Sequence, residues 1–238
     1  MKAIFTLVFV LVHAIVFSQG STSADAQQNI YELGEDNTKG IVRIYDNRYQ
    51  GVKGSPYLYP SWSQGKVKLE GEEIVGEAEI KLNLYQNDLI YKNSATKKVL
   101  AIDNASEFTI NNPRTNKELI FEKVQFKLGK NKEMKGYLEV LYSNQVMLYK
   151  RYKVKFIKAD FQGAYSSGRK YDEFKRSEEL YVKDLKGKFW FLKPSKKRFQ
   201  EIFSDKSSEL KSLFRKDKLI LTDEKAILEV IKYYESLH

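Results

Sequence analysis

The chain has 238 residues, of which 42% are hydrophobic and 30% charged, so it is predicted to fold as one or two globular domains. It contains no cysteine, which excludes disulfide bonds, thiolate nucleophiles, Cys-ligated zinc and Cys-ligated iron–sulfur clusters. The net charge is +10, and most of the basic residues are lysine rather than arginine. Since arginine is the residue that reads phosphates and base edges, this composition argues against a nucleic-acid partner.

The N-terminal residues are typical of a secretory signal peptide. Lys2 gives a basic start, residues 3–17 are apolar except for Thr6 and His13, and small polar residues follow. The apolar run is shorter than the about 20 residues of a membrane-spanning helix, and no cysteine follows it for lipid attachment. We expect a signal peptide at 1–18, with cleavage as late as residue 26. The product would be exported to the periplasm or the medium, without a transmembrane segment or a lipid anchor.

The next part of the chain reads as β-structure. Residues 19–39 are polar and predict a loose N-terminal arm, and residues 40–192 predict an antiparallel β domain. Apolar and polar residues alternate at 78–84, 124–128 and 152–156. Such alternation buries one face of a strand and leaves the other in water, as antiparallel sheets do. Turn signals at 143–145 and 184–187 predict two hairpins, and the whole pattern predicts a barrel or a sandwich.

The apolar period changes after Pro194, and residues 193–238 predict three short helices packed on the sheet. Ser195 is the expected N-cap of the first helix, and Thr222 is expected to open the third. The apolar stripes consist of Phe199, Ile202 and Phe203, then Leu210, Leu213 and Phe214, then Ile227, Val230, Ile231, Tyr234 and Leu237. The predicted fold class is therefore α+β, an antiparallel β-barrel or sandwich with a C-terminal set of three short helices.

Residues 159–177 follow neither period. They combine glycine and serine with aromatic and basic side chains. Unstructured connections of this length are uncommon in compact domains and are often functional. We therefore expect this loop and the concave face of the sheet to be the contact surfaces.

The sequence offers few groups for catalysis. Its histidines are His13, in the leader, and His238, the last residue, so neither a Ser-His-Asp triad nor a histidine-ligated metal has an imidazole within the fold. No residue is a candidate catalyst or metal ligand, and no cofactor is expected. A carboxylate-based glycan hydrolase stays open, because it needs only two acidic residues at a set separation. No spacing singles out such a pair, so a non-catalytic protein is favoured.

Aromatic and basic side chains supply the candidate ligand-binding residues. Tyr57, Tyr59 and Trp62 lie close together in a proline-containing segment, where their rings would stack on a ligand or plug one end of the sheet. A second group in the 159–177 loop interleaves rings and cations, and consists of Tyr165, Arg169, Lys170 and Tyr171. The three neighbouring rings at 189–191 are assigned to the core, with at least one of them expected to face outward or to pack under a helix. The candidate partners are an anionic glycan, a lipid headgroup or an envelope protein.

Two short motifs carry a resemblance to known proteins. They are GSPYL at 54–58, followed by Trp62, Gly65 and Val67, and the closing YYESL at 233–237. In these motifs the chain resembles a family of small secreted proteins of unknown function from Gram-negative environmental bacteria. The resemblance implies export and assigns no role to any residue. We therefore predict an exported, non-catalytic protein that binds a ligand or partner, with a structural envelope module and the glycan hydrolase as alternatives.

Overall fold

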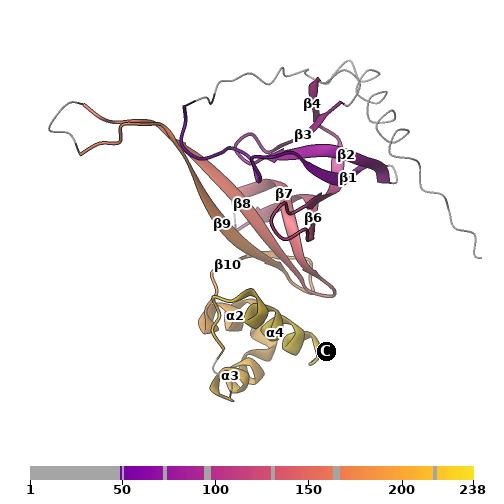
Figure 1. Ribbon diagram of the computed structural model, residues 1–238. Helices are drawn as coiled ribbons and strands as arrows, with labels where there is room; N and C mark the ends of the chain where they lie inside the picture. The colour runs from indigo at the N-terminus through magenta and orange to yellow at the C-terminus, as the bar shows by residue number, and fades with distance from the viewer. Residues whose placement is uncertain are drawn as a thin grey trace, which may run out of the picture.

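The computed structural model describes Tyr49 and residues 51–71, 74–93, 98–129, 132–162, 167–216 and 219–238. The predicted signal peptide and N-terminal arm lie outside these residues. In the described part, one antiparallel sheet of ten strands is followed by three α-helices, which group together at one end of the sheet (Figure 1). None of the described helices has the length and apolar character that crossing a membrane would need.

The strands in chain order are β1 (Ser63–Leu69), β2 (Ile74–Asn83), β3 (Asp88–Lys92), β4 (Val99–Ile102), β5 (Ala105–Asn111), β6 (Glu118–Leu128), β7 (Lys132–Ser143), β8 (Met147–Ile157), β9 (Glu173–Lys183) and β10 (Phe189–Leu192). The helices are α2 (Lys196–Ile202), the 3₁₀ turn η1 (Ser204–Lys206), α3 (Ser207–Lys216) and α4 (Glu224–Glu235). The strand order in the sheet is β10-β9-β8-β7-β6-β5-β1-β2-β3-β4. An antiparallel sheet followed by helices confirms the predicted α+β class. Within the described residues the two end strands do not pair with each other, so the prediction of a closed barrel is wrong.

The sheet is strongly curled. Residues 53–58, here called the bridging segment, pair with β9 through Lys53↔Glu173 and with β2 through Tyr57↔Asn83. In a flat sheet these two strands, six spacings apart in the strand order, would be separated by about 29 Å. Lys53 and Tyr57 are joined by at most about 14 Å of extended chain. The two parts of the sheet must therefore fold toward each other, which explains how an open sheet encloses a core.

This curl encloses a first core, called cluster 1, between β1–β7 and the buried Leu58 of the bridging segment. At its centre Phe108 stacks on Phe121 with 4.9 Å between the ring centroids, and Tyr137 packs edge-on against Phe108. Side chains of β1 are buried and exposed in strict alternation, as the period of two requires. Leu89 and Ile80, on the neighbouring strands, are fully buried. Cluster 1 is thus a sealed interior.

The three helices cover the sheet near β10 and form a second core, called cluster 2. Their apolar stripes pack against Leu148 and Val182 of the sheet. Ser195 caps α2 as predicted, since its hydroxyl accepts a hydrogen bond from the Arg198 amide at 3.2 Å. The N-cap of α4 is Asp223, which accepts from the Lys225 amide, so the prediction of Thr222 was wrong by one residue. A carboxylate is the stronger acceptor for the unpaired amides of a first turn.

The opposite face of the sheet carries a smaller core, called cluster 3. Tyr149 and Tyr181 point into it, because neighbours along a strand face opposite sides. Here β10 folds back toward β6, and Phe189 stacks on Phe126 with 4.1 Å between the ring centroids. A flat sheet would separate these two strands by about 19 Å. The sheet therefore curls one way around cluster 1 and the other way around cluster 3.

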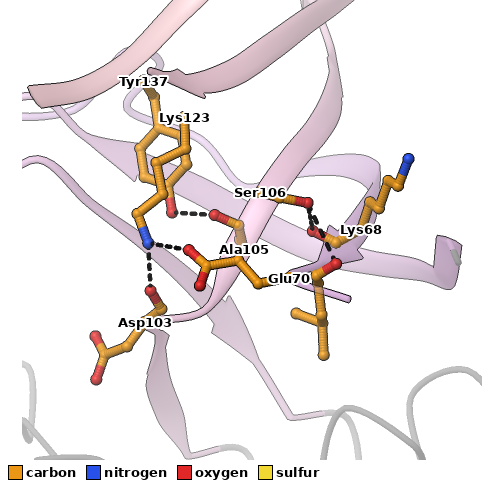
Figure 2. A network of polar contacts seen from close by, with 8 residues as sticks. Lys68, Glu70, Asp103, Ala105, Ser106, Lys123 and Tyr137 are labelled. Carbon is orange, nitrogen blue, oxygen red and sulfur yellow. Dashed lines mark hydrogen bonds and ion pairs between the residues drawn. The ribbon is translucent and has the colours of Figure 1, made fainter. Parts of the chain in front are cut away.

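A polar network fixes an irregularity between β1 and β5 (Figure 2). Lys68 pairs with Glu107 but Leu69 pairs with Ala105, so Ser106 is an extra residue in β5. The Ser106 hydroxyl lies 3.2 Å from the carbonyl oxygens of both Lys68 and Leu69. It thereby supplies hydrogen bonding where the bulge interrupts the ladder.

The same network joins β1 to the β4–β5 turn and to β6 and β7. Lys123 Nζ donates to Glu70 Oε1 and to the Asp103 carbonyl oxygen, both at 2.9 Å, and the Tyr137 hydroxyl donates to the Ala105 carbonyl at 3.1 Å (Figure 2). The hydrogen bond from Lys123 lowers the pKa of the Glu70 carboxyl. Burial raises the pKa of Tyr137, which keeps this hydroxyl a donor.

Both predicted hairpins are confirmed, but the predicted loop is shorter than expected. β7 and β8 are joined by residues 144–146, and β9 and β10 by 184–188. β9 begins at Glu173, so residues 173–177 of the predicted 159–177 loop are strand. They pair with β8 while Lys175, Arg176 and Ser177 are all exposed. Phe174 is buried in this part of β9, but three consecutive exposed residues follow it, so no alternation marks it as a strand.

Candidate functional site

The structure brings Tyr57 and Trp62 together and separates Tyr59 from them. Lys81 Nζ lies 5.0 Å from the centroid of the Tyr57 ring and 4.8 Å from that of Trp62. The two rings thus hold a cation supplied by the protein itself. Burial lowers the pKa of Lys81. Tyr59 instead packs against cluster 1, so these three rings form no common stacking platform, and ligand binding by them stays a prediction.

Three residues of the second predicted group lie at the end of the β8–β9 hairpin, and Tyr165 lies outside the described residues. The Tyr171 hydroxyl accepts a hydrogen bond from Lys53 Nζ at 3.1 Å. Lys170 Nζ lies 5.0 Å from the ring centroid of Phe161. Arg169 pairs with Glu173 at 3.9 Å. Rings and cations therefore gather here as the sequence predicted, and their function stays a prediction.

Glu139 on β7 is the described acid whose pKa is raised. Its side chain faces cluster 1 with only 5% exposed, and the Tyr152 hydroxyl donates to its Oε2 at 2.6 Å. Burial raises the pKa of Glu139, and the hydrogen bond from Tyr152 offsets part of that rise. A carboxyl this deeply packed acts within the fold, so it lends no support to the hydrolase alternative, which stays untested.

The sequence analysis missed a pocket beside the edge strand β10. The pocket has a volume of about 520 Å³, within the range of small-molecule sites. It lies where the β6–β7 connection approaches β9, β10 and the start of α2, at the open end of cluster 3. The residues that line it are Leu128, Gly129, Lys132, Glu179, Tyr181, Lys188, Phe189, Trp190, Phe191 and Arg198.

Aromatic rings form much of the pocket lining. Phe191 packs edge-on against Tyr181 with 5.7 Å between the centroids, and 40% of Phe191 is exposed. Phe189, two residues before it on the same face of β10, is held by its stacking on Phe126. The expectation that at least one of the rings at 189–191 faces outward or packs under a helix is therefore confirmed by Phe191. A flat apolar group could stack on these rings.

Three cationic side chains border the pocket. The Arg198 guanidinium donates from Nε and Nη2 to the Phe191 carbonyl at 2.9 and 2.8 Å, which fixes the start of α2 against β10. Lys188 Nζ lies 3.6 Å from the ring centroid of Trp190. Lys132 is exposed at the start of β7. The pocket thus joins an apolar interior to a positively charged rim.

Glu179 is the one acid among the described lining residues, and neighbouring side chains stabilise its charge. Glu179 accepts hydrogen bonds from Lys153 Nζ at 2.8 Å and from the Tyr181 hydroxyl at 2.7 Å. Burial works against its charge, but these bonds outweigh that effect and lower the pKa of the carboxyl. Burial, together with the bond to Glu179, raises the pKa of Tyr181 to about 12. Glu179 therefore stays charged at neutral pH, and Lys153 balances that charge.

No protein-family model, curated protein or solved structure matches the chain. The resemblance to secreted bacterial proteins is therefore untested and stays a prediction. The function has to be argued from the site itself.

Proposed function

We propose that the protein is an exported binding protein whose pocket beside β10 takes an anionic ligand with a flat apolar part. The observation that carries this proposal is the combination of aromatic lining and cationic rim in one pocket of about 520 Å³. Export is supported by the basic start, apolar run and small-residue exit of residues 1–26.

The two ligand features follow from the two parts of the pocket. The exposed Phe191 and the half-buried Phe189 offer ring surface to a flat apolar group, with a gain of about 0.5–1.5 kcal/mol for each good ring pair. Lys132 and Lys188 favour an anionic group at the rim, where water screens part of the attraction. Because Lys153 balances Glu179, that carboxylate adds little repulsion.

The test uses two dyes that differ by one charged group. 1-Anilinonaphthalene-8-sulfonate has two flat ring systems and a sulfonate, and N-phenyl-1-naphthylamine is its neutral counterpart. We expect the native protein to bind the sulfonate more tightly than the neutral dye in a fluorescence titration. Phe191→Ala should weaken both dyes about fivefold. Lys188→Gln should weaken the sulfonate about threefold and leave the neutral dye unchanged.

The control variant is Leu185→Ala, which removes a similarly exposed apolar side chain from the β9–β10 turn outside the pocket. It should bind both dyes as the wild type does. Near-UV circular dichroism checks that each variant keeps native packing, since unfolded or loosened states also bind this sulfonate. Equal affinity of wild type and Phe191→Ala, or an equal loss in Leu185→Ala, would refute the pocket.

Export is tested separately. The full chain would be produced in a Gram-negative host, and the mass of the protein in the periplasmic fraction measured. A mass that lacks residues 1–18, or as much as 1–26, supports the proposal. A full-length protein confined to the cytoplasm would contradict the export part alone and leave the pocket unaffected.

A further inference from the structure

The connection between β8 and β9 lies at the end of the longest hairpin of the sheet. The two strands pair along β8 as far as Ile157↔Glu173, and Figure 1 shows them running out beyond the other strands and away from the helices. The described parts of the connection, 158–162 and 167–172, are here called the hairpin tip. This tip projects into solvent.

A cluster of rings fixes the base of the tip. Phe174, Tyr49 and Tyr85 form a triangle of rings, in which Phe174 lies 5.0 Å from Tyr49 and 5.5 Å from Tyr85, and the two tyrosines lie 6.4 Å apart. Phe156, on the other strand, lies 5.2 Å from Phe174. The Lys53 carbonyl accepts a hydrogen bond from the Phe174 amide at 2.8 Å, which ties the bridging segment to the same place. The tip is therefore carried on a well-packed support.

The acids of the tip bind its own backbone. Asp172 Oδ1 accepts from the Ala159 amide at 2.7 Å, and Asp160 Oδ1 accepts from the Arg169 amide. Gly168 allows the two sides of the tip to approach closely, since an added Cβ would lie 2.5 Å from the Asp160 carbonyl oxygen. Both carboxylates thus serve as hydrogen-bond acceptors for backbone amides within the tip.

Rings and lysines form the outer surface of the tip. Phe161 is 40% exposed and Tyr171 is 43% exposed, large fractions for aromatic side chains. Each ring has a lysine against it: Lys170 lies over Phe161, and Lys53 over Tyr171 at 4.9 Å. Lys158 is exposed beside them. Aromatic rings next to lysines are the combination that protein surfaces use at the headgroup level of a membrane.

The pairing of two lysines across the hairpin also favours an anionic partner. Lys155 on β8 pairs directly with Lys175 on β9, and both side chains are exposed. Like charges opposite each other destabilise a strand pair. An anionic surface next to the hairpin would relieve this repulsion, whereas the free protein bears it.

We propose that the hairpin tip docks on the surface of an anionic phospholipid bilayer, with Phe161 and Tyr171 at the headgroup level and the surrounding lysines against the lipid phosphates. This role is separate from the pocket beside β10. A membrane is favoured over a soluble polyanion because two exposed rings would gain from an apolar boundary, while a sulfated glycan would need the cations alone.

The test measures binding of the full mature chain to vesicles by co-sedimentation. Vesicles of phosphatidylcholine alone are compared with vesicles that contain about 30% phosphatidylglycerol. We expect binding to the anionic vesicles only, weakened by salt. The double variant Lys158→Gln/Lys170→Gln should lose about 25-fold in affinity, about fivefold for each lysine. Phe161→Ala should lose roughly fivefold.

Matched controls remove the same groups elsewhere. Lys211→Gln/Lys225→Gln removes two exposed charges from α3 and α4, and Ile120→Ala removes an apolar side chain of 43% exposure from β6. Both should bind vesicles as the wild type does. An equal loss in tip and control variants would overturn the proposal, because the binding would then follow net charge.

A heparin column distinguishes a glycan partner. If the lysine variant lost vesicle and heparin binding while Phe161→Ala retained vesicle binding, the tip would be a polyanion site and the membrane proposal would be wrong. Vesicle binding that needs Phe161 as well as the lysines supports it. Neither result affects the dye titrations of the pocket.

Discussion

The two halves of the sheet solve the same packing problem in different ways. Around cluster 1 the strand β1 alternates strictly between buried and exposed residues, and the bridging segment covers the interior with buried Pro56 and Leu58. Around cluster 3 the sheet curls the other way, and the short strand β10 carries half-buried and exposed rings. The first half is sealed, and the second is left with an open pocket at its end.

The difference teaches where to look for function in such a fold. Side chains that the chain itself shields from solvent, such as those of cluster 1, contribute to stability. A core that ends in exposed aromatic side chains retains apolar surface that a ligand could cover. Substitutions around cluster 1 should therefore lower the free energy of unfolding, and substitutions at the pocket should lower the affinity for a ligand.

The largest expected effect comes from the sealed half. Phe108 is 1% exposed and stacked on Phe121, so Phe108→Ala should lower the free energy of unfolding by about 3–5 kcal/mol. Phe191→Ala, on the exposed side of the pocket, should change it by roughly 0.5 kcal/mol or less. Urea denaturation followed by circular dichroism measures both. Similar losses in the two variants would remove the distinction between the halves.

A middle-sized effect with a pH signature is expected at Glu139. Its pKa is raised in the folded protein by burial, so the protonated form favours folding. That contribution is complete below the unfolded pKa of about 4.5 and is lost as the pH rises through the folded pKa. Glu139→Gln keeps the side chain neutral, so it should add on the order of 1–3 kcal/mol at pH 8 and little at pH 4.

The measurement is the free energy of unfolding at several pH values between 4 and 8. The exposed Glu118→Gln is the control and should give a difference that does not grow with pH. If Glu139→Gln were destabilised most at high pH, the buried carboxylate would be favourable to the fold, and the direction argued from its burial would be wrong.

The smallest effect tests the bulge in the wall of cluster 1. Ser106→Ala removes the hydroxyl that reaches the Lys68 and Leu69 carbonyls, and it should cost about 1 kcal/mol. Ser177→Ala, in the exposed part of β9, should change stability by less than about 0.5 kcal/mol. Thermal unfolding of the two variants compares them. Identical midpoints would mean that the hydroxyl does not stabilise the bulge.

Sequence patterns predicted the elements whose signal is local. The alternation at 78–84, the turn at 184–187 and the N-cap Ser195 all lie within one element or one turn, and the structure confirms the turn, the N-cap and the alternation as far as Leu82; Asn83 is buried and β2 ends there. The curl could not be predicted, because it depends on Lys53 pairing with Glu173 across more than a hundred residues. The start of β9 was missed because Lys175, Arg176 and Ser177 are consecutive exposed residues, which interrupt the alternation.

The two candidate sites also differ in how close together their residues lie in the sequence. The rings and cations of the hairpin tip are close together in sequence, so Arg169, Lys170 and Tyr171 could be singled out before the structure was known. The pocket draws its lining from the β6–β7 connection, β9, β10 and α2, and no local pattern joins them. Three consecutive rings at 189–191 predict that at least one faces outward or packs under a helix, and only the three-dimensional arrangement shows that Phe191 is the exposed one.

The bridging segment has a mechanical consequence for the whole molecule. It is hydrogen-bonded to β9 by Lys53 and to β2 by Leu58, so a few residues connect the hairpin support to the wall of the sealed interior. A protease that cut the chain between Lys53 and Leu58 would break the covalent link between these two contacts. Limited proteolysis at this point is therefore expected to loosen two distant parts of the protein together.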